Sequence, residues 1–303
     1  SDVCSSDLEL IAGNRCERPL NKDKKNLDSP NSYLYKQQLI TNLKKEQLKG
    51  SFPNGTVGMP LGLNVYEMYP FWTAFWNRLG YRVLLSPFGS KQLFTRGQYT
   101  IPSDTICYPA KLIHGHIEWL LEKDVDFIFY PCLSYNFDEN ISDNHYNCPV
   151  VAYYPQVIEA NVQKINNDNF VFGFYGVHNK KFMKKQLTKD LAKRIGANGR
   201  KIGEALDAAY AAQQAYYEKQ KNFTDQAIQY ARIHELPIIV LAGRPYHVDP
   251  EINHGIDRLV QSFNTVVISE DGLPFIYGDT DTHVLNQWTY HARLYQAAHY
   301  VVD

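Results

Sequence analysis

Two features that would point to a membrane or to a nucleic acid are missing from this chain. No apolar run approaches the roughly 18 to 20 residues that a membrane span requires. Lysine and arginine together number 31, against 32 for aspartate and glutamate, so no basic field is available to attract nucleic acid or an anionic membrane surface. We therefore expect neither a membrane nor a nucleic acid among its partners.

The first eight residues, SDVCSSDL, are interpreted as a sequencing-adapter scar. Their codons can spell the end of a widely used short-read adapter, and the chain has no initiator methionine. Segments of this kind carry no information about a fold. We therefore set residues 1–8 aside. We expect the rest, which stops in an apolar run at its far end, to be an internal fragment of a longer protein.

Cysteine is scarce as well. Of the five cysteines, four remain once Cys4 in the scar is set aside: Cys16, Cys107, Cys132 and Cys148. They are too few and too widely separated for a disulfide framework in a chain of 303 residues. We therefore expect free thiols in a reducing compartment, and we place the protein in the cytoplasm.

The chain is long and apolar enough to form more than one core. Its 303 residues are 44% hydrophobic and 14% aromatic, which is typical of a globular protein with about two domains. Helical patterns alternate with short apolar runs, and such alternation predicts parallel βαβ units. Strands are expected at 56–59, 81–86, 127–130, 150–153, 237–242 and 265–269.

The fold class predicted is α/β, with two Rossmann-like lobes whose mainly parallel sheets are joined by a helical segment. Residues 9–55 would hold a truncated cysteine motif, a linker and a helix. The first lobe would cover 56–163, a helical insert or bridge 164–236, and the second lobe, truncated at its C-terminus, 237–303. Residues before about Ser32 are expected to pack poorly, because the lysine-rich linker has little apolar surface to offset its loss of conformational entropy.

Two cysteines are expected at one edge of the first sheet. Cys107 precedes a helix over 109–122, whose free N–H groups and dipole favour a thiolate. Cys132 follows the strand at 127–130, at the carboxyl end that faces the ligand crevice of an open α/β sheet. Both thiols could face one cleft as soft-metal ligands. The alternative is that both are small hydrophobic residues of the core, where free cysteine is often found.

A second polar group follows the strand at 237–242. Arg244 and His247 stand at a helix start, with His254 shortly after, and such a start can hold an anionic group such as a phosphate. The alternative is an ordinary solvated turn capped by Asp249. Neither G-x-G-x-x-G nor a Walker A loop is present, so a nucleotide fingerprint is not supported.

Two histidines follow Cys107 on the expected helix. His114 and His116 are two positions apart and therefore point about 200° apart on a helix. They are poorly placed to serve one metal ion. His114 shares a face with apolar residues, which favours a buried core histidine over a ligand.

Several separated motifs occur in a defined order along nearly the whole chain after residue 8. They are Gly13-Asn-Arg-Cys16-Glu, Val57 to Trp72, Ile101 to His116, Phe129-Tyr-Pro-Cys132, Tyr146-Asn-Cys148-Pro, Ala242 to Gly255, and Gln287-Trp-Thr-Tyr-His-Ala-Arg293. Together they resemble the uncharacterised domain of acyl-CoA dehydratase activase-related proteins. That domain is similar to the subunits of the 2-hydroxyacyl-CoA dehydratase and benzoyl-CoA reductase group.

The resemblance implies a [4Fe-4S] cluster held by cysteines between α/β lobes. Cys107 and Cys132 match the first two ligand positions, and Cys148 could complete the site or merely pack. In the family a further cysteine follows the segment that ends here at Val302. Cys16 matches the last member of a separate cysteine group, so it would belong to a second, truncated metal site.

The resemblance also implies a function and partners. The leading interpretation is an iron–sulfur-bearing domain of an ATP-dependent electron-transfer system that acts on acyl-CoA thioesters. Its partners would be ATP-hydrolysing activase modules of the actin-like fold in the same full-length chain. The alternative is a non-catalytic scaffold that docks those modules and holds a structural metal, such as zinc at Cys16, or none. A third is a small-molecule-binding α/β module with unligated cysteines. Whether the domain is itself an enzyme is left open, and this fragment alone is expected to be inactive.

Overall fold

A four-stranded parallel sheet forms the centre of the first lobe in the computed structural model, which describes residues 28–274 and 284–302. Its strands are β1 (Gly55–Met59), β2 (Tyr81–Leu85), β3 (Phe127–Phe129) and β4 (Phe170–Val171), in the spatial order β2-β1-β3-β4. Every pairing is parallel. The chain moves out from β1 in one direction to β2 and in the other to β3. The carboxyl ends of β1 and β3 therefore mark the crevice where sheets of this kind bind ligands.

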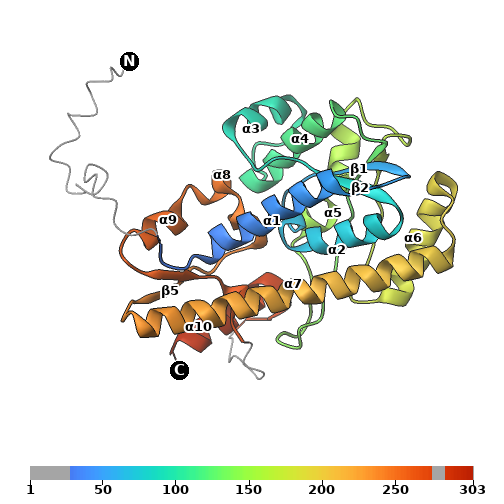
Figure 1. The fold of residues 1–303 in the computed structure, drawn as a ribbon. Helices are drawn as coiled ribbons and strands as arrows, with labels where there is room; N and C mark the ends of the chain where they lie inside the picture. Colours follow the sequence, from blue (N-terminus) through green and yellow to red (C-terminus); the bar gives the residue numbers. More distant parts are fainter. Residues whose placement is uncertain (1–27, 275–283, 303) are drawn as a thin grey trace, which may run out of the picture.

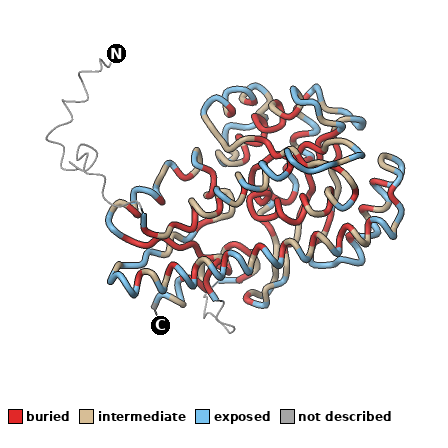
Figure 2. Tube along the Cα trace, in the orientation of Figure 1, coloured by how far each residue is buried: buried red, intermediate tan, exposed pale blue. Residues whose placement is uncertain are grey.

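Helices cover this sheet (Figure 1). They are α2 (Val65–Arg78), α4 (Tyr108–Leu121) and α5 (Pro149–Asn161), and the short α3 (Lys91–Gly97) packs on α4. The helix α2 packs an aromatic face on the sheet: the rings of Trp72 and Trp76 lie 4.8 and 5.1 Å from that of Phe129. Figure 2 shows buried chain concentrated where α2 meets the strands. This aromatic layer is the main core of the first lobe.

The second lobe has a smaller parallel sheet of β5 (Ile238–Val240) and β6 (Val266–Ile268). Around it lie η3 (Pro245–Val248), α8 (Pro250–Asn253), α9 (Ile256–Gln261), η4 (Glu270–Gly272) and α10 (Thr289–Val302). Its apolar core is small and consists largely of alanine and aliphatic side chains. The predicted α/β fold with two mainly parallel sheets is confirmed.

Two helices connect the lobes, as the sequence predicts: α6 (Lys180–Ile195) and the 35-residue α7 (Gly199–Ile233). Figure 1 shows α7 running along both lobes. Its buried residues recur every three or four positions, from Ile202 near the first lobe to Ala231 near the second. A helix of this length spans about 52 Å at 1.5 Å per residue. It therefore serves both cores as a common support.

The first helix, α1 (Ser32–Lys49), also links the lobes, and it packs against α7: the ring of Tyr35 stacks on that of Phe223 at 4.2 Å. Asn31 caps α1, and its amide also donates to Asp257 at 3.0 Å and Gln261 at 3.2 Å. The N–H of Val267 in β6 donates to the carbonyl of Pro30 at 3.0 Å. The expectation of poor packing before Ser32 is therefore wrong for residues 29–31, because hydrogen bonds rather than apolar contacts anchor them. Asp28 is exposed, and residues 1–27 lie outside the described part of the chain.

Two further predictions need correction. Residues 150–153 were expected to form a strand, yet they lie in α5, which Cys148 and Pro149 begin. The sequence also predicts a single helix over 251–263, but the chain forms two, α8 and α9, which are separated at His254 and Gly255 with φ angles of 56° and 74°. In both segments the local capping signals, rather than the apolar pattern, determine the secondary structure.

Candidate functional site

Cys107 lies at the start of α4, at the carboxyl edge of the first sheet. It is the N-cap residue, it is exposed, and its side chain makes no capping hydrogen bond. Pro109 stands in the first turn, where a missing N–H costs nothing. The thiol therefore sits beside the unpaired N–H groups of a helix start and is free to bind a ligand.

Cys132 lies beyond the end of β3 and is fully buried. Its N–H donates to the carbonyl of Gly173 at 2.9 Å, and its own carbonyl accepts the N–H of Tyr175 at 3.1 Å. Burial raises the pKa of the Cys132 thiol to about 12. The backbone N–H of Gln156 acts in the opposite direction and lowers this pKa by less. The thiol is therefore protonated at neutral pH, and a metal ion would have to displace that proton to bind.

Cys148 is the N-cap of α5, with Pro149 as the first helical residue. It is half-buried and makes no side-chain capping hydrogen bond. It lines a pocket of about 300 Å³ whose far wall, including Trp288, comes from the second lobe. A third cysteine thus stands at the carboxyl edge of the first sheet, again at a helix start.

Two tyrosine hydroxyls lie among these cysteines. Burial raises the pKa of Tyr130 far above its ordinary value, and the neighbouring Cys132 and Cys107 raise it further. Burial also raises the pKa of Tyr246 in the second lobe; the charge of Arg244 opposes this, and Cys107 and Cys148 add smaller increases. Cys107 is therefore within electrostatic reach of both phenols, one shared with Cys132 and the other with Cys148.

The donor set suits a soft metal group. Thiolates are the preferred ligands of iron–sulfur clusters and of structural zinc. The hydroxyl of Tyr130 is buried without a hydrogen-bond partner in the described chain, so it can donate to a sulfur atom bound nearby. Within residues 28–274 and 284–302, however, no group of three or more histidine, cysteine or acidic side chains has the arrangement of a metal site. The cysteines fit such a group but do not form a complete ligand set.

The predicted anion-binding residues separate in the structure. Arg244 lines the same pocket as Cys148, and its Nη2 donates to Nε2 of His291 at 2.9 Å. His247 instead accepts the N–H of Arg244 on Nδ1 at 2.8 Å and so caps η3. His254 is exposed at the end of α8. Of these three, Arg244 alone lines the pocket.

Comparison with known families assigns the chain to one protein family. The family described as the CoA enzyme activase uncharacterised domain matches residues 56–273, which is well over half of the 303 residues. The chain belongs to this family. No curated protein matches the chain. The predicted resemblance to activase-related proteins is therefore confirmed at the level of the family, and the match spans the first sheet, the connecting helices and most of the second lobe.

Some residues of this activase-family domain escaped the site prediction. His291, Tyr130 and Tyr246 were not proposed as site residues, although each lies in a motif quoted for the resemblance. The signal available was the dense aromatic and histidine content of those motifs.

Cys16, predicted for a separate metal site, lies outside the described residues. No helix in the described chain combines the length and apolarity needed to cross a membrane.

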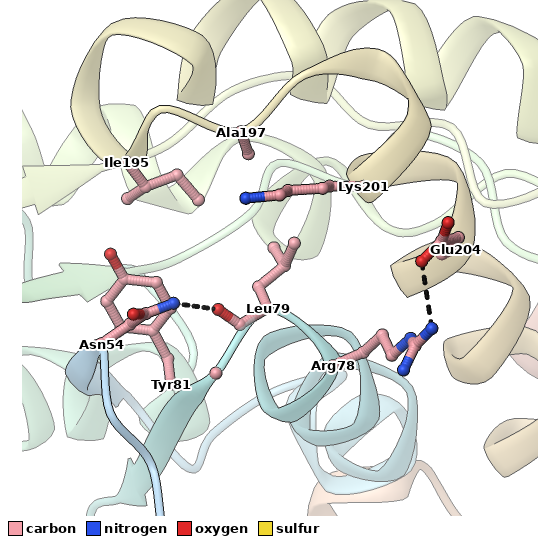
Figure 3. Close-up of a pocket in the computed structure, with 9 residues that line it drawn as sticks. Asn54, Arg78, Leu79, Tyr81, Ile195, Ala197, Lys201 and Glu204 are labelled. Atoms are coloured by element: carbon pink, nitrogen blue, oxygen red, sulfur yellow. Dashed lines mark hydrogen bonds and ion pairs between the residues drawn. The ribbon is translucent and has the colours of Figure 1, made fainter.

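A second pocket of about 330 Å³ lies at the opposite edge of the first sheet (Figure 3). Its wall includes Asn54, before β1, and Tyr81, at the start of β2. Arg78 at its rim is paired with Glu204 at 3.0 Å. Open α/β sheets bind ligands at the carboxyl ends of their strands, so this amino-end pocket is the weaker candidate.

The two histidines of α4 are core residues, as predicted for His114. His114 hydrogen-bonds to Thr100 at 2.7 Å and to Tyr154 at 3.0 Å, and His116 bonds to Ser86 at 2.8 Å. Burial lowers the pKa of His114 to about 4 and that of His116 to about 3. Both are therefore neutral structural residues of the domain.

Proposed function

We propose that this domain binds a [4Fe-4S] cluster through Cys107 and Cys132, with Cys148 as a further ligand. The observation that supports this most strongly is the position of the thiols: Cys107 is the N-cap of α4 and buried Cys132 follows β3, both at the carboxyl edge of the first sheet. The domain would serve an ATP-dependent electron-transfer system that acts on acyl-CoA thioesters. When bound, such a cluster supplies a low-potential electron or a Lewis acid.

The residues of the chain would have distinct tasks in this function. Buried Cys132 anchors the cluster in a dry environment, while exposed Cys107 faces the side from which a partner approaches. The O–H of Tyr130 donates to a sulfur atom and so stabilises negative charge on the site. Burial and hydrogen bonding of this kind set the reduction potential of a cluster.

Membership of the activase family supports a partnership with ATP-hydrolysing activase modules of the actin-like fold. Those modules would supply the electrons, and the carboxyl edge of the first sheet is the face on which they would deliver them. A reducing cytoplasm is part of the proposal, because thiols that bind iron have to stay free.

The test is iron and sulfide analysis of the chain after anaerobic reconstitution, with electron paramagnetic resonance of the reduced protein. Cys107→Ala is the informative variant, because Cys107 is exposed and its removal leaves the core intact. We expect it to lose most of the bound iron. Thr105→Ala, an exposed substitution in the same loop, is the matched control and should keep it.

Two outcomes would contradict the proposal. If the unaltered chain takes up no iron, or if Cys107→Ala binds as much iron as the control, these cysteines are not cluster ligands. Stoichiometric zinc in place of iron would favour the scaffold interpretation. Thermal unfolding of each variant shows whether lost iron reflects lost structure.

A further inference from the structure

The pocket beside Cys148 is bounded by both lobes. The rings of Tyr146 and Trp288 face each other across its wall at 6.2 Å, and Tyr290 adds a third ring. The N–H of Tyr146 donates to Gln287 at 3.0 Å, and the carbonyl of Tyr146 accepts the N–H of Thr289 at 3.1 Å. These backbone bonds fix the walls relative to each other. The pocket is therefore formed before any ligand arrives.

The polar end of this pocket carries an arginine and a neutral histidine. Nη2 of Arg244 donates to Nε2 of His291 at 2.9 Å. Because a guanidinium can only donate, Nε2 must accept, and the ring proton of His291 sits on Nδ1. Burial and the charge of Arg244 both lower the pKa of His291, which keeps it neutral. The histidine orients Arg244 without cancelling its charge.

The charge of Arg244 has no counterpart among the described residues. The ion pairs within 28–274 and 284–302 involve other arginines and lysines. Arg293, two positions beyond His291 on α10, shows the contrast: it is paired with Glu67 at 2.6 Å and Glu139 at 2.5 Å. A partly buried cation beside three aromatic rings therefore faces the pocket unpaired.

We infer that this pocket binds a small carboxylic acid with a hydrophobic body, its carboxylate on Arg244 and its body against the rings of Trp288 and Tyr146. A volume of about 300 Å³ is at the lower end for ligand pockets, which limits the occupant to a small molecule. A phosphate alone would leave the rings uncovered, and a neutral thioester carbonyl would leave the charge of Arg244 uncompensated. The inference does not rest on the cluster, since binding needs no iron.

The test is calorimetric titration of the metal-free 303-residue chain with hexanoate, hexanamide and hexanoyl-CoA. We expect hexanoate to bind at least tenfold more tightly than the isosteric hexanamide, and more tightly than hexanoyl-CoA. Arg244→Gln should weaken hexanoate at least tenfold, because a charge-assisted hydrogen bond is lost, and Arg244→Lys should lose less. Arg258→Gln, an exposed arginine on α9, is the matched control and should leave binding unchanged.

Three outcomes would overturn the inference: no saturable binding of hexanoate at millimolar concentration, equal binding by Arg244→Gln, or tighter binding of hexanoyl-CoA than of hexanoate. The last would assign the pocket to a thioester. Trp288→Phe provides a second measurement, because ligand-dependent quenching of tryptophan fluorescence should vanish in that variant while binding persists. Failure here leaves the iron analysis unaffected, and the reverse also holds.

Discussion

Aromatic rings form much of the core of the first lobe, whereas the contact between the lobes combines apolar packing, to which Val248 and Val267 contribute, with buried charges and hydrogen bonds. In the first lobe Trp72 and Trp76 are fully buried against the sheet. At the junction, Arg293 of α10 is 2% exposed and pairs with Glu67 of α2 and with Glu139. The junction between the lobes thus adds buried ion pairs to an apolar contact, whereas the interior of the first lobe is largely aromatic.

A second buried pair strengthens the contrast. Lys36 of α1 lies 2.6 Å from Asp271 in η4, next to the buried Glu270. Hydrophobic burial has no preferred direction, while an ion pair with its hydrogen bonds has a defined geometry. The buried ion pairs therefore help to fix how the lobes face each other, and they make that orientation dependent on protonation.

The largest effect should come from the aromatic core. Trp72→Ala should lower the free energy of unfolding by about 3 to 5 kcal/mol, because a large buried side chain leaves a cavity. The loss should be similar at pH 5 and pH 8 in urea titrations. Trp72→Phe, which keeps a ring, should cost clearly less. A loss that changes strongly with pH would mean that charges, not rings, hold the first lobe.

Arg293→Met should cost about 3 kcal/mol at pH 8, because Glu67 and Glu139 are left buried without their cation. Burial already raises the pKa of Glu139, and Arg293 is the group that lowers it. In the variant the carboxyl groups should protonate more readily, so the loss should shrink at pH 5. Arg78→Met, which breaks the exposed pair with Glu204, should cost less than about 1 kcal/mol. Equal losses for the two arginines would remove the distinction between lobe junction and surface.

The smallest effect concerns Glu270. Burial and Asp271 raise its pKa to about 7, well above that of an unfolded chain. Its protonated form therefore favours the folded state: this contribution is complete below about pH 4.3 and is lost as pH rises through about 7. The free energy of unfolding of Glu270→Gln, relative to that of the unaltered chain, should rise by about 2 kcal/mol as the pH is raised from 5 to 8. The exposed Glu218→Gln should show no such gain. If Glu270→Gln is less stable than the unaltered chain at pH 8, the assigned sign is wrong.

The sequence was sufficient for the larger elements of the fold. The helices α2, α4 and α7 have long amphipathic patterns, and β1, β2 and β3 have apolar runs bounded by turns, so local signals and the fold agree. The sequence failed where the pattern was ambiguous. Residues 150–153 contain β-branched and aromatic side chains typical of a strand, but Pro149 begins a helix there. The two-residue strand β4 is too short to show any period.

Topology fixes where the candidate cysteines lie. Helix starts and strand ends share the carboxyl edge of a parallel sheet, so the sequence places Cys107 and Cys132 there, while their role as ligands stays a prediction. Arg244 was selected from its loop, but its partner His291 is 47 positions away in the sequence. That contact depends on how α10 is placed within the second lobe. No local pattern encodes that placement, because buried pairs such as Arg293 with Glu67 determine it.

The anchoring of residues 29–31 against β6 also governs the order of events during synthesis. Ser29 donates to the carbonyl of Thr265 at 2.8 Å, across 236 positions in the sequence. A ribosome adding 5 to 20 residues per second needs about 10 to 50 s to make that stretch. During this time the first lobe can already collapse on its aromatic layer, whereas the segment leading into α1 still lacks its hydrogen-bond partners. Chaperones that cover nascent chains would therefore meet this domain as a folded lobe with an unfinished leading edge.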